Sequence, residues 1–348
     1  MKKTTQIIGM MCMVGLLAIG STSCKKETAK TVSSFDITLP AIEGDAPFDD
    51  AKAYIDMMDG GKMKWYQGDN VMMYSIDEDY TNSQVQEFTG DAQTGDAQAH
   101  FSGTPMNVGD VGFFAFYPAS KASTTIGKDN RATFNVGNTQ TYVTDLFANT
   151  SRAGLIFMDP QCFVGAATCD VIEPSANFVL KPIFGYINVR IKDSNASDKR
   201  VKSVTITDSQ RNLTGTMSVL IPALKSADLD AMKQLGVNYK NNGNIDTYMT
   251  QMESKLHEIG YMADGNGHSV TLNVEAANEG MGATINGSYK YFLIPIRPGA
   301  LMGDFTVTLS FFGEDDMEIS VPADKKYISI PGYYTNVSID LKNGGTVL

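Results

Sequence analysis

The sequence predicts a mainly β protein, made of two tandem antiparallel β-sandwich domains with a small helical insertion in the second. Apolar residues recur at every second position over many short segments, and Gly, Pro, Asn and Asp separate those segments. Helical spacing is confined to about residues 224–260. The best candidate boundary is the segment DVIEPSAN at residues 170–177. We therefore expect one sandwich in residues 34–172 and a second in residues 173–348.

Residues 1–23 have the organisation of a secretory signal peptide. Two lysines precede an apolar run at residues 7–20, and three small residues follow it. A transmembrane helix would need roughly 18 or more apolar residues, so this run is too short to span a bilayer. The ending STSC, at Cys24, resembles the lipobox of lipoproteins from Bacteroides-type bacteria. That resemblance implies a lipid anchor on Cys24, and the alternative is an ordinary signal peptide with an incidental cysteine.

The first half of the chain combines a tether with a series of short strands. Residues 24–33 are polar and lack periodicity, so we expect them to hold the folded part away from the membrane. Both faces of Val111–Tyr117 are apolar, which predicts a central strand covered on two sides. Residues 89–98 repeat a polar unit, TGDAQ, and should form an exposed loop. The other expected strands are Phe35–Leu39, Asn70–Ile76, Ala99–Phe101, Ala132–Val136 and Leu155–Met158.

In the second half, apolar and polar residues alternate more regularly. The segment 183–192 has aliphatic residues on one face and Asn188, Arg190 and Lys192 on the other. Residues 305–321 predict a hairpin around the turn Gly313–Asp316. Because each strand has one apolar face, we expect stacked sheets with one buried face per strand.

Two helices interrupt this pattern in the second half. The first should be short, with Ser226 as its N-cap and Gly236 at its end. The second should run from Ile245 to Ile259 and end at Gly260. We expect both to pack their apolar, Met-rich faces against the second sandwich as core rather than as a ligand groove.

Charge and cysteine content restrict the function further. The chain has 28 basic and 39 acidic residues, and its net charge of −11 becomes −13 without the signal, which carries two Lys and no acid. Such an acidic chain with few Arg argues against a nucleic-acid partner. Cys162 and Cys169 remain after maturation, with six residues between them. This spacing permits a disulfide in an oxidising compartment without requiring one, and no further cysteine supports a metal site.

No motif points to catalysis, so we expect no enzyme activity, no catalytic residue and no cofactor. The three histidines, His100, His257 and His268, are far apart in sequence. No nucleophile elbow, zinc-binding helix motif or phosphate-binding Gly loop occurs. Residues 264–275 begin like a calcium loop, but Ser269 stands where that loop needs Gly, so a turn opening a strand is expected.

Seven short segments follow the order seen in one family of surface proteins. The chain resembles the fimbrillin family, the FimA- and Mfa-like pilus subunits and surface lipoproteins of Bacteroides-type bacteria. The order of the segments carries the resemblance, because each one is short. They are KWYQGDNVMMY (Lys64–Tyr74), HFSG (His100–Gly103), FFAFYP (Phe113–Pro118), FVLKPIFGYINVRI (Phe178–Ile191), NLTGTMSV (Asn212–Val219), YFLIPIRPG (Tyr291–Gly299) and IPGYYTNVSIDL (Ile330–Leu341).

The resemblance implies two β-sandwich domains and a role in cell-surface adhesion or pilus building through protein–protein contacts. The partners would be other pilus subunits or ligands on host or bacterial surfaces. The location would be the outer membrane, as a lipoprotein at the cell surface or in a fimbrium. Trp65, Gly68 and Asp69 would be scaffold positions, an aromatic anchor beside a tight turn that enters a strand.

Family pilins are cleaved after a basic residue early in the first domain, and the groove that opens accepts a strand from the next subunit. This chain has no Arg before Arg131, although Lys52 or Lys62 could serve another protease. Either the last strand is donated or the subunit does not donate. The candidate donor strand has on one face Tyr333, Thr335, Val337, Ile339 and Leu341.

We therefore expect an accessory, anchor or tip subunit rather than a stalk pilin. The alternative is a surface glycan-binding lipoprotein. Sugar platforms favour exposed tryptophan, and Trp65 is the only one in the chain. The 15 tyrosines keep this alternative open without locating a site.

Overall fold

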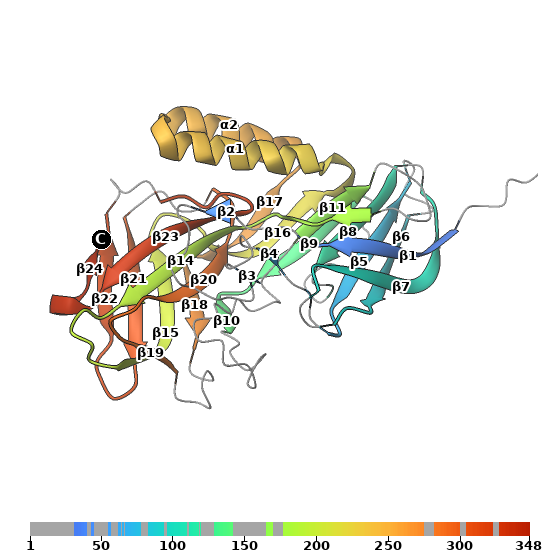
Figure 1. Ribbon diagram of the computed structural model, residues 1–348. Coiled ribbons are helices and arrows are strands. Elements are labelled where there is room, and N and C mark those ends of the chain that lie inside the picture. Colours follow the sequence, from blue (N-terminus) through green and yellow to red (C-terminus); the bar gives the residue numbers. More distant parts are fainter. Residues whose placement is uncertain are drawn as a thin grey trace, which may run out of the picture.

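Figure 1 shows the computed structural model, with sheets at both ends and two helices lying together along one side. Most of the chain is strand, as the sequence predicts. The residues that the structure describes are 31–39, 43–44, 55–56, 62–63, 65, 67–77, 83–93, 96–109, 111–117, 119, 129–141, 165–169, 177–274, 282–299, 304–322 and 327–348.

The N-terminal sheet consists of β1 (Thr31–Thr38), β5 (Asn70–Ile76), β6 (Gln84–Gly90), β7 (Gln98–Asn107), β8 (Gly112–Tyr117), β11 (Gly165–Cys169), β12 (Asn177–Val179) and β13 (Lys181–Pro182). Their order is β12-β1-β7-β6-β5-β8-β11-β13. The two end strands belong to one continuous segment, because β12 pairs with β1 and β13 pairs with β11. Between them, Leu180 donates its backbone N–H to the Thr38 carbonyl oxygen at 3.0 Å. This segment therefore connects the two ends of the sheet over part of their length.

β8 is an interior strand of this sheet, between β5 and β11, and all six of its residues are buried. Phe113 and Tyr117 point into the first core, the apolar cluster enclosed by the N-terminal sheet. Phe114 and Phe116 point the other way, into a separate cluster that we name the third core. The prediction of a central strand covered on two sides is confirmed.

Two further sheets stack at the other end of the molecule. One is built from β2 (Glu43–Gly44), β14 (Gly185–Lys192), β20 (Lys290–Ile296), β23 (Tyr333–Asp340) and β24 (Thr346–Val347). The other is built from β10 (Thr139–Thr141), β15 (Lys199–Asp208), β18 (Ser269–Asn273), β19 (Ala283–Ile285), β21 (Phe305–Phe311) and β22 (Met317–Val321). We name them the five-stranded and the six-stranded sheet. Their facing aliphatic side chains, such as Val189 and Leu309, form the second core.

The third core joins the two ends of the molecule. It lies among β9 (Arg131–Val136), β16 (Thr214–Leu220), α1 (Ser226–Asn242), α2 (Ile245–Glu258) and the outer face of the N-terminal sheet. β17 (Met262–Gly267) completes a three-stranded sheet with β16 and β9. The remaining short elements are β3 (Ile55–Asp56), β4 (Lys62–Met63) and the 3-10 turns η5 (Ile221–Ala223) and η7 (Lys342–Gly344).

The first helix differs from its prediction at both ends. Its N-cap is Lys225, and Ser226 is the first helical residue. The helix continues through Gly236 to Asn242. Gly236 is therefore an interior residue of the helix, and it lies against the side chain of Ile330. A Cβ at position 236 would come within 2.4 Å of Ile330 Cγ1, so glycine permits the close approach.

The second helix matches its prediction more closely. Its N-cap is Asn244, whose side-chain oxygen accepts from the N–H groups of Asp246 and Thr247. Gly260 follows its end with a φ of +59°, a left-handed conformation that suits glycine. Met252 and Tyr248 are buried in the third core, so the apolar face of α2 is core. This core includes residues of the N-terminal sheet, so the helices do not pack against the second sandwich alone.

The pairing between strands is more mixed than the sequence predicts. Most described pairs are antiparallel, but β12–β1, β10–β18, β14–β23 and β2–β23 are parallel. Strands β2, β9 and β10, which precede residue 172, pair with strands of the second half. β1 begins three residues inside the predicted tether. The division at residues 172 and 173 stays a prediction, and the pairing crosses it.

Candidate interaction surfaces

The first strand of the folded part is held inside the N-terminal sheet. β1 pairs with β7 on one side and with β12 on the other. Phe35 is 1% exposed, and its ring centroid lies 5.6, 5.1 and 5.2 Å from those of Phe88, Phe113 and Phe178. β1 begins within the predicted tether, so a lipid anchor on Cys24 would lie close in sequence to a strand that is fixed in the first core.

Trp65 is hydrogen-bonded to β1. Its indole Nε1–H donates to the carbonyl oxygen of Ile37 at 3.2 Å, and its backbone N–H donates to the backbone carbonyl oxygen of Asp96 at 2.7 Å. Its ring makes edge contacts with Phe101 and Tyr117, at centroid distances of 4.8 and 5.0 Å. The side chain is fully buried, so it is an aromatic anchor and not an exposed platform for a sugar.

The turn after Trp65 and the TGDAQ loop are joined by backbone hydrogen bonds. Gly68 has a φ of +91°, and the Asp69 carbonyl accepts from Gly90 at 3.1 Å. The carboxylates of Asp91 and Asp96 accept backbone N–H groups of the same region. Ala92 is buried, so part of the loop expected to be fully exposed packs into the first core.

The three histidines lie apart, as their spacing in the sequence suggests. His100 Nδ1 lies 2.8 Å from Asp36 across the β1–β7 pair, with both side chains partly exposed. His257 is exposed on α2, and His268 Nδ1 lies 3.0 Å from the Arg211 carbonyl oxygen. Among the described residues, no group of His, Cys, Asp and Glu has the geometry of a metal site.

The candidate donor strand is an interior strand of the five-stranded sheet. β23 runs parallel to β14 over seven residue pairs and is flanked on its other side by β2 and β24. Val337, Ile339 and Leu341 pack in the second core, whereas Thr335 donates to the Ile328 carbonyl at 3.0 Å. Tyr333 packs against the third core. Donation of this strand to a neighbour stays a prediction.

The other face of β23 and β14 is also covered, contrary to the expectation of one buried face. Asn188 is buried, and its amide donates to Asn336 at 2.7 Å. Tyr186 and Tyr334, opposite each other in the same pair of strands, belong to the first core. The five-stranded sheet therefore lies between two cores, which is why a polar residue of the alternating pattern is buried.

Polar contacts at the end of β23 hold the turn that follows β14. Hydrogen bonds from the hydroxyl and the backbone N–H of Ser194 and from the Lys342 N–H lower the pKa of Asp340 to about 2. Lys192, 3.8 Å away, acts in the same direction. The ionised carboxylate therefore holds together the turn after β14 and the residues that follow β23.

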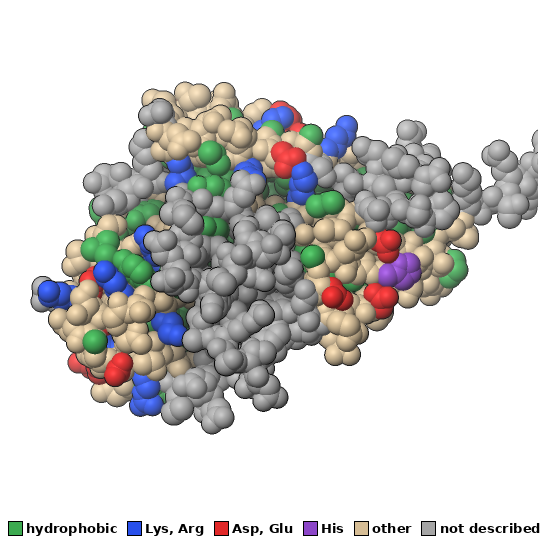
Figure 2. All heavy atoms as spheres, in the orientation of Figure 1, with side chains coloured by type: hydrophobic (Ala, Val, Ile, Leu, Met, Phe, Trp, Pro, Cys, Tyr) green, Lys and Arg blue, Asp and Glu red, His purple; other side chains and the backbone are tan. Residues whose placement is uncertain are grey.

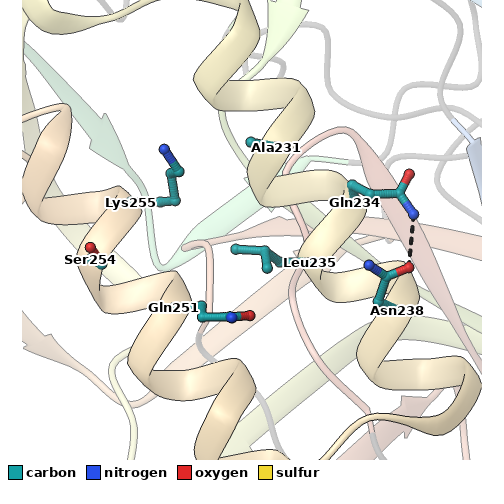
Figure 3. Close-up of a pocket in the computed structure, with 7 residues that line it drawn as sticks. All are labelled: Ala231, Gln234, Leu235, Asn238, Gln251, Ser254 and Lys255. Atoms are coloured by element: carbon teal, nitrogen blue, oxygen red, sulfur yellow. Dashed lines mark hydrogen bonds between the residues drawn. The ribbon is translucent and has the colours of Figure 1, made fainter.

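A shallow groove of about 370 Å³ lies between α1 and α2 on the outside of the molecule (Figure 3). Leu235 and Ala231 face it from α1, and Gln251 and Lys255 face it from α2. The Lys255 ammonium donates a hydrogen bond to the Glu258 carboxylate, which raises the pKa of Lys255. Lys255 also lies 3.7 Å from Asp228 of α1 and so connects the helices. The lining is amide-rich, and its charged group already has acidic partners.

Figure 2 shows how charge is distributed over one face of the molecule. Lys and Arg side chains are interspersed with acidic and uncharged ones, and no continuous basic area is visible among the coloured residues. The coloured part of this face therefore shows no cluster of cations of the kind that a nucleic-acid partner requires. No helix in the described part of the chain is both long and apolar enough to cross a bilayer.

The predicted covalent sites lie outside what the structure describes. Cys24 and Cys162 are not among the described residues, and of Cys169 only the backbone position at the end of β11 is described. The lipid anchor and the candidate disulfide both stay predictions.

Comparisons with family models and with curated proteins give no match. Among solved structures, the chain is similar to a candidate cell adhesion protein from Bacteroides ovatus, with 12% identity, a TM-score of 0.48, and 92% of this chain and 96% of that one covered. A candidate cell adhesion protein from Bacteroides uniformis has 13% identity and a TM-score of 0.43, covering 90% and 96%. A fimbrial assembly protein from Parabacteroides distasonis has 11% identity and a TM-score of 0.35, covering 92% and 99%. The structural neighbours are thus candidate cell adhesion and fimbrial proteins of low sequence identity.

Proposed function

We propose that this chain is an exported, lipid-anchored component of cell-surface adhesion or of a pilus, and that it acts through protein–protein contacts. One observation carries the proposal. All seven segments that resemble fimbrillins coincide with scaffold elements of the fold, namely the Trp65 anchor and strands β5, β7, β8, β12–β14, β16, β20 and β23. The resemblance therefore follows the framework of the molecule from one end to the other.

The chain acts as an accessory, anchor or tip subunit rather than as a stalk pilin. Two features support this finer role. β23 is paired on both sides within its own sheet, and the residues after it fold back along it through β24. The first half also has no Arg before Arg131 at which an Arg-directed protease could release β1.

The proposed role involves no catalysis. His100 is engaged with Asp36, His268 with a backbone carbonyl, and His257 lies beside Glu258 on the exposed side of α2. The three histidines are therefore not gathered into one group, which supports a role without histidine-based nucleophilic catalysis.

The proposal is tested in cells that carry the wild-type chain, Cys24→Ala or Cys169→Ala. We expect the wild type and Cys169→Ala in the membrane fraction, open to protease added outside intact cells. Cys24→Ala should appear in soluble fractions, because it has no acyl chains to bury. Filaments sheared from the wild-type cells should contain the protein as a minor component.

Three results would contradict the proposal in different ways. Membrane retention of Cys24→Ala would exclude the proposed lipid anchor on Cys24. Recovery of the protein as the main repeating subunit of the filaments would make it a stalk pilin instead. A protein that stays inside the cell would exclude any role in surface adhesion.

A further inference from the structure

Two cations and a phenyl ring form a cluster on the surface of the six-stranded sheet. The Arg200 guanidinium carbon and the Lys202 ammonium nitrogen each lie 5.4 Å from the centroid of the Phe312 ring, which is a cation–π distance. Arg200 is exposed, and the other two side chains are partly exposed. We name these three residues the cation cluster. Figure 1 shows their strands, β15 and β21, at the opposite end of the molecule from the N-terminal sheet.

The backbone holds the cation cluster in place. The Phe312 N–H donates to the Arg200 carbonyl oxygen at 2.9 Å. Gly282 lies against the ring, because a Cβ at this position would come within 2.7 Å of Phe312 Cε2. The register of β15 against β21 shifts at Lys202, and such a bulge redirects a side chain. The cluster is therefore ordered before a partner arrives, which lowers the cost of binding.

An acidic turn lies beside the cation cluster. In this turn, between β21 and β22, the Glu314 carboxylate accepts a hydrogen bond from the Lys199 ammonium at the start of β15. That contact brings the turn next to the strand that carries the two cations. Asp315 and Asp316 of the same turn are exposed. One end of the sheet thus presents two cations and two further carboxylates side by side.

These four charged groups are not paired with one another. Among the described residues, neither cation of the cluster lies at ion-pair distance from a carboxylate, and neither Asp315 nor Asp316 lies at that distance from a cation. Other cations, such as Lys181 and Lys199, do have acidic partners. The chain has 39 acidic residues for 28 basic ones, so an unpaired pair of neighbouring cations is unusual here. This surface therefore has charges of both signs available to a partner.

We propose that two copies of this chain associate through the cation cluster and the acidic turn, related by a two-fold axis. Such an axis joins the same surface of both copies, so a surface that carries both charges side by side can complement itself. The cations of each copy then face Asp315 and Asp316 of the other, and Phe312 supplies apolar contact. Arg and aromatic residues are enriched among interface anchors. A uniformly acidic partner is disfavoured, because the acidic turn would repel it.

The test is analytical ultracentrifugation of the full mature chain, made without its lipid as Cys24→Ala. Exposed ion pairs contribute little individually, so the dimer is weak, and the protein concentration is raised to about 1 mM. Two ionic strengths are compared, about 0.01 M and about 1 M, at which charges are screened over about 30 and 3 Å. Association through the cluster should be strong only at the lower one.

Three double variants reverse charges, and circular dichroism checks that each is folded. In the control, one position follows the far end of β15 and the other precedes α1, so both lie away from the cluster in the chain. The control changes the net charge by the same amount as the cation variant. The three are Arg200→Glu/Lys202→Glu (the cation variant), Asp315→Lys/Asp316→Lys (the acid variant) and Arg211→Glu/Lys225→Glu (the control).

We expect the wild type and the control to dimerise at low ionic strength and to dissociate at high ionic strength. The cation variant alone and the acid variant alone should self-associate at least about 100-fold more weakly, because like charges then face each other. An equal mixture of these two variants should dimerise again, since each supplies the charges that the other lacks. If the cation variant fails to fold, Arg200→Gln/Lys202→Gln takes its place, with a loss of at least about 10-fold expected.

Four results would overturn the proposal. They are a wild type that stays monomeric up to about 1 mM, a dimer that persists at high ionic strength, a control weakened as much as the cation variant, and a mixture of the cation and acid variants that stays monomeric. Each of these leaves the pilus role unaffected, because that role is measured in membrane fractions and sheared filaments.

Discussion

Phe35→Ala tests how firmly the N-terminal sheet holds its first strand. The ring is buried against Phe88 of β6, Phe113 of β8 and Phe178 of β12, with centroids 5.1–5.6 Å away. Replacing a buried Phe by Ala costs about 3–5 kcal/mol, because the lost contacts leave a cavity. We expect about 4 kcal/mol here, since the neighbours belong to three strands that cannot all move into the space.

The fluorescence of Trp65 provides the assay, because it is the only tryptophan and lies in the same core. With a urea dependence of about 3 kcal/mol per molar, the unfolding midpoint should fall by more than 1 M. Ser33→Ala, at an exposed position of the same strand, should change the free energy of unfolding by less than about 0.5 kcal/mol. A Phe35→Ala midpoint within about 0.3 M of wild type would refute the packing described for β1.

Three further changes have defined outcomes. Gly185→Ala would place a Cβ 2.1 Å from the Ser329 hydroxyl oxygen. The free energy of unfolding should therefore fall by about 2 kcal/mol or more in a thermal unfolding experiment. An unchanged melting temperature would contradict that contact. Gly260→Ala should cost about 1 kcal/mol in the same measurement, because alanine strains at a φ of +59°, and a neutral result would mean that the helix end relaxes. In the folded protein, the hydrogen bond from the Ser194 hydroxyl is the main cause that lowers the pKa of Asp340 from 3.8 to about 2. The ionised carboxylate therefore adds to the free energy of unfolding above pH 3.8, and this addition is lost as the pH falls towards 2. Asp340→Asn should make the urea midpoint depend less on pH in that range, and parallel curves for variant and wild type would exclude the effect.

The elements that depend on local pattern could be predicted from the sequence. Asn70–Ile76 forms a strand with the predicted bounds, and Phe305–Phe311 forms the predicted hairpin with Met317–Val321. Gly260 follows the end of the second helix in a left-handed conformation, as the local sequence predicts. Periodicity and capping are properties of a few adjacent residues, and so they can be recognised without knowledge of the rest of the fold.

The choice of partner could not be predicted, because it is decided by residues far apart in the chain. The parallel pairing of β23 with β14 joins positions 148 residues apart, such as Asn188 and Asn336. Gly236 has a local pattern typical of a helix end, but its role is to admit Ile330 from a distant segment. Sequence alternation also cannot show whether a second layer covers the polar face of a strand, as happens at Asn188.

The polar outer face of the six-stranded sheet could be predicted from the sequence only in part. The alternation of Thr306, Thr308 and Ser310 with apolar residues predicts an exposed polar face on one strand. That three such strands lie side by side with their hydroxyls aligned follows only from register, as in the row of Thr271, Thr205 and Thr308.

The segment 177–182 has a consequence for how the molecule meets its neighbours. By pairing with the last three residues of β1 through β12 and with the first two residues of β11 through β13, it covers part of both end strands of the N-terminal sheet. An unpaired strand border is a template for stacking between identical chains, so this segment prevents such stacking at the positions where it pairs. At these positions, a strand from another protein can join only after a resident strand has departed. Attachment there would then be governed by the rate of a cut or of local opening, and not by the concentration of the incoming chain.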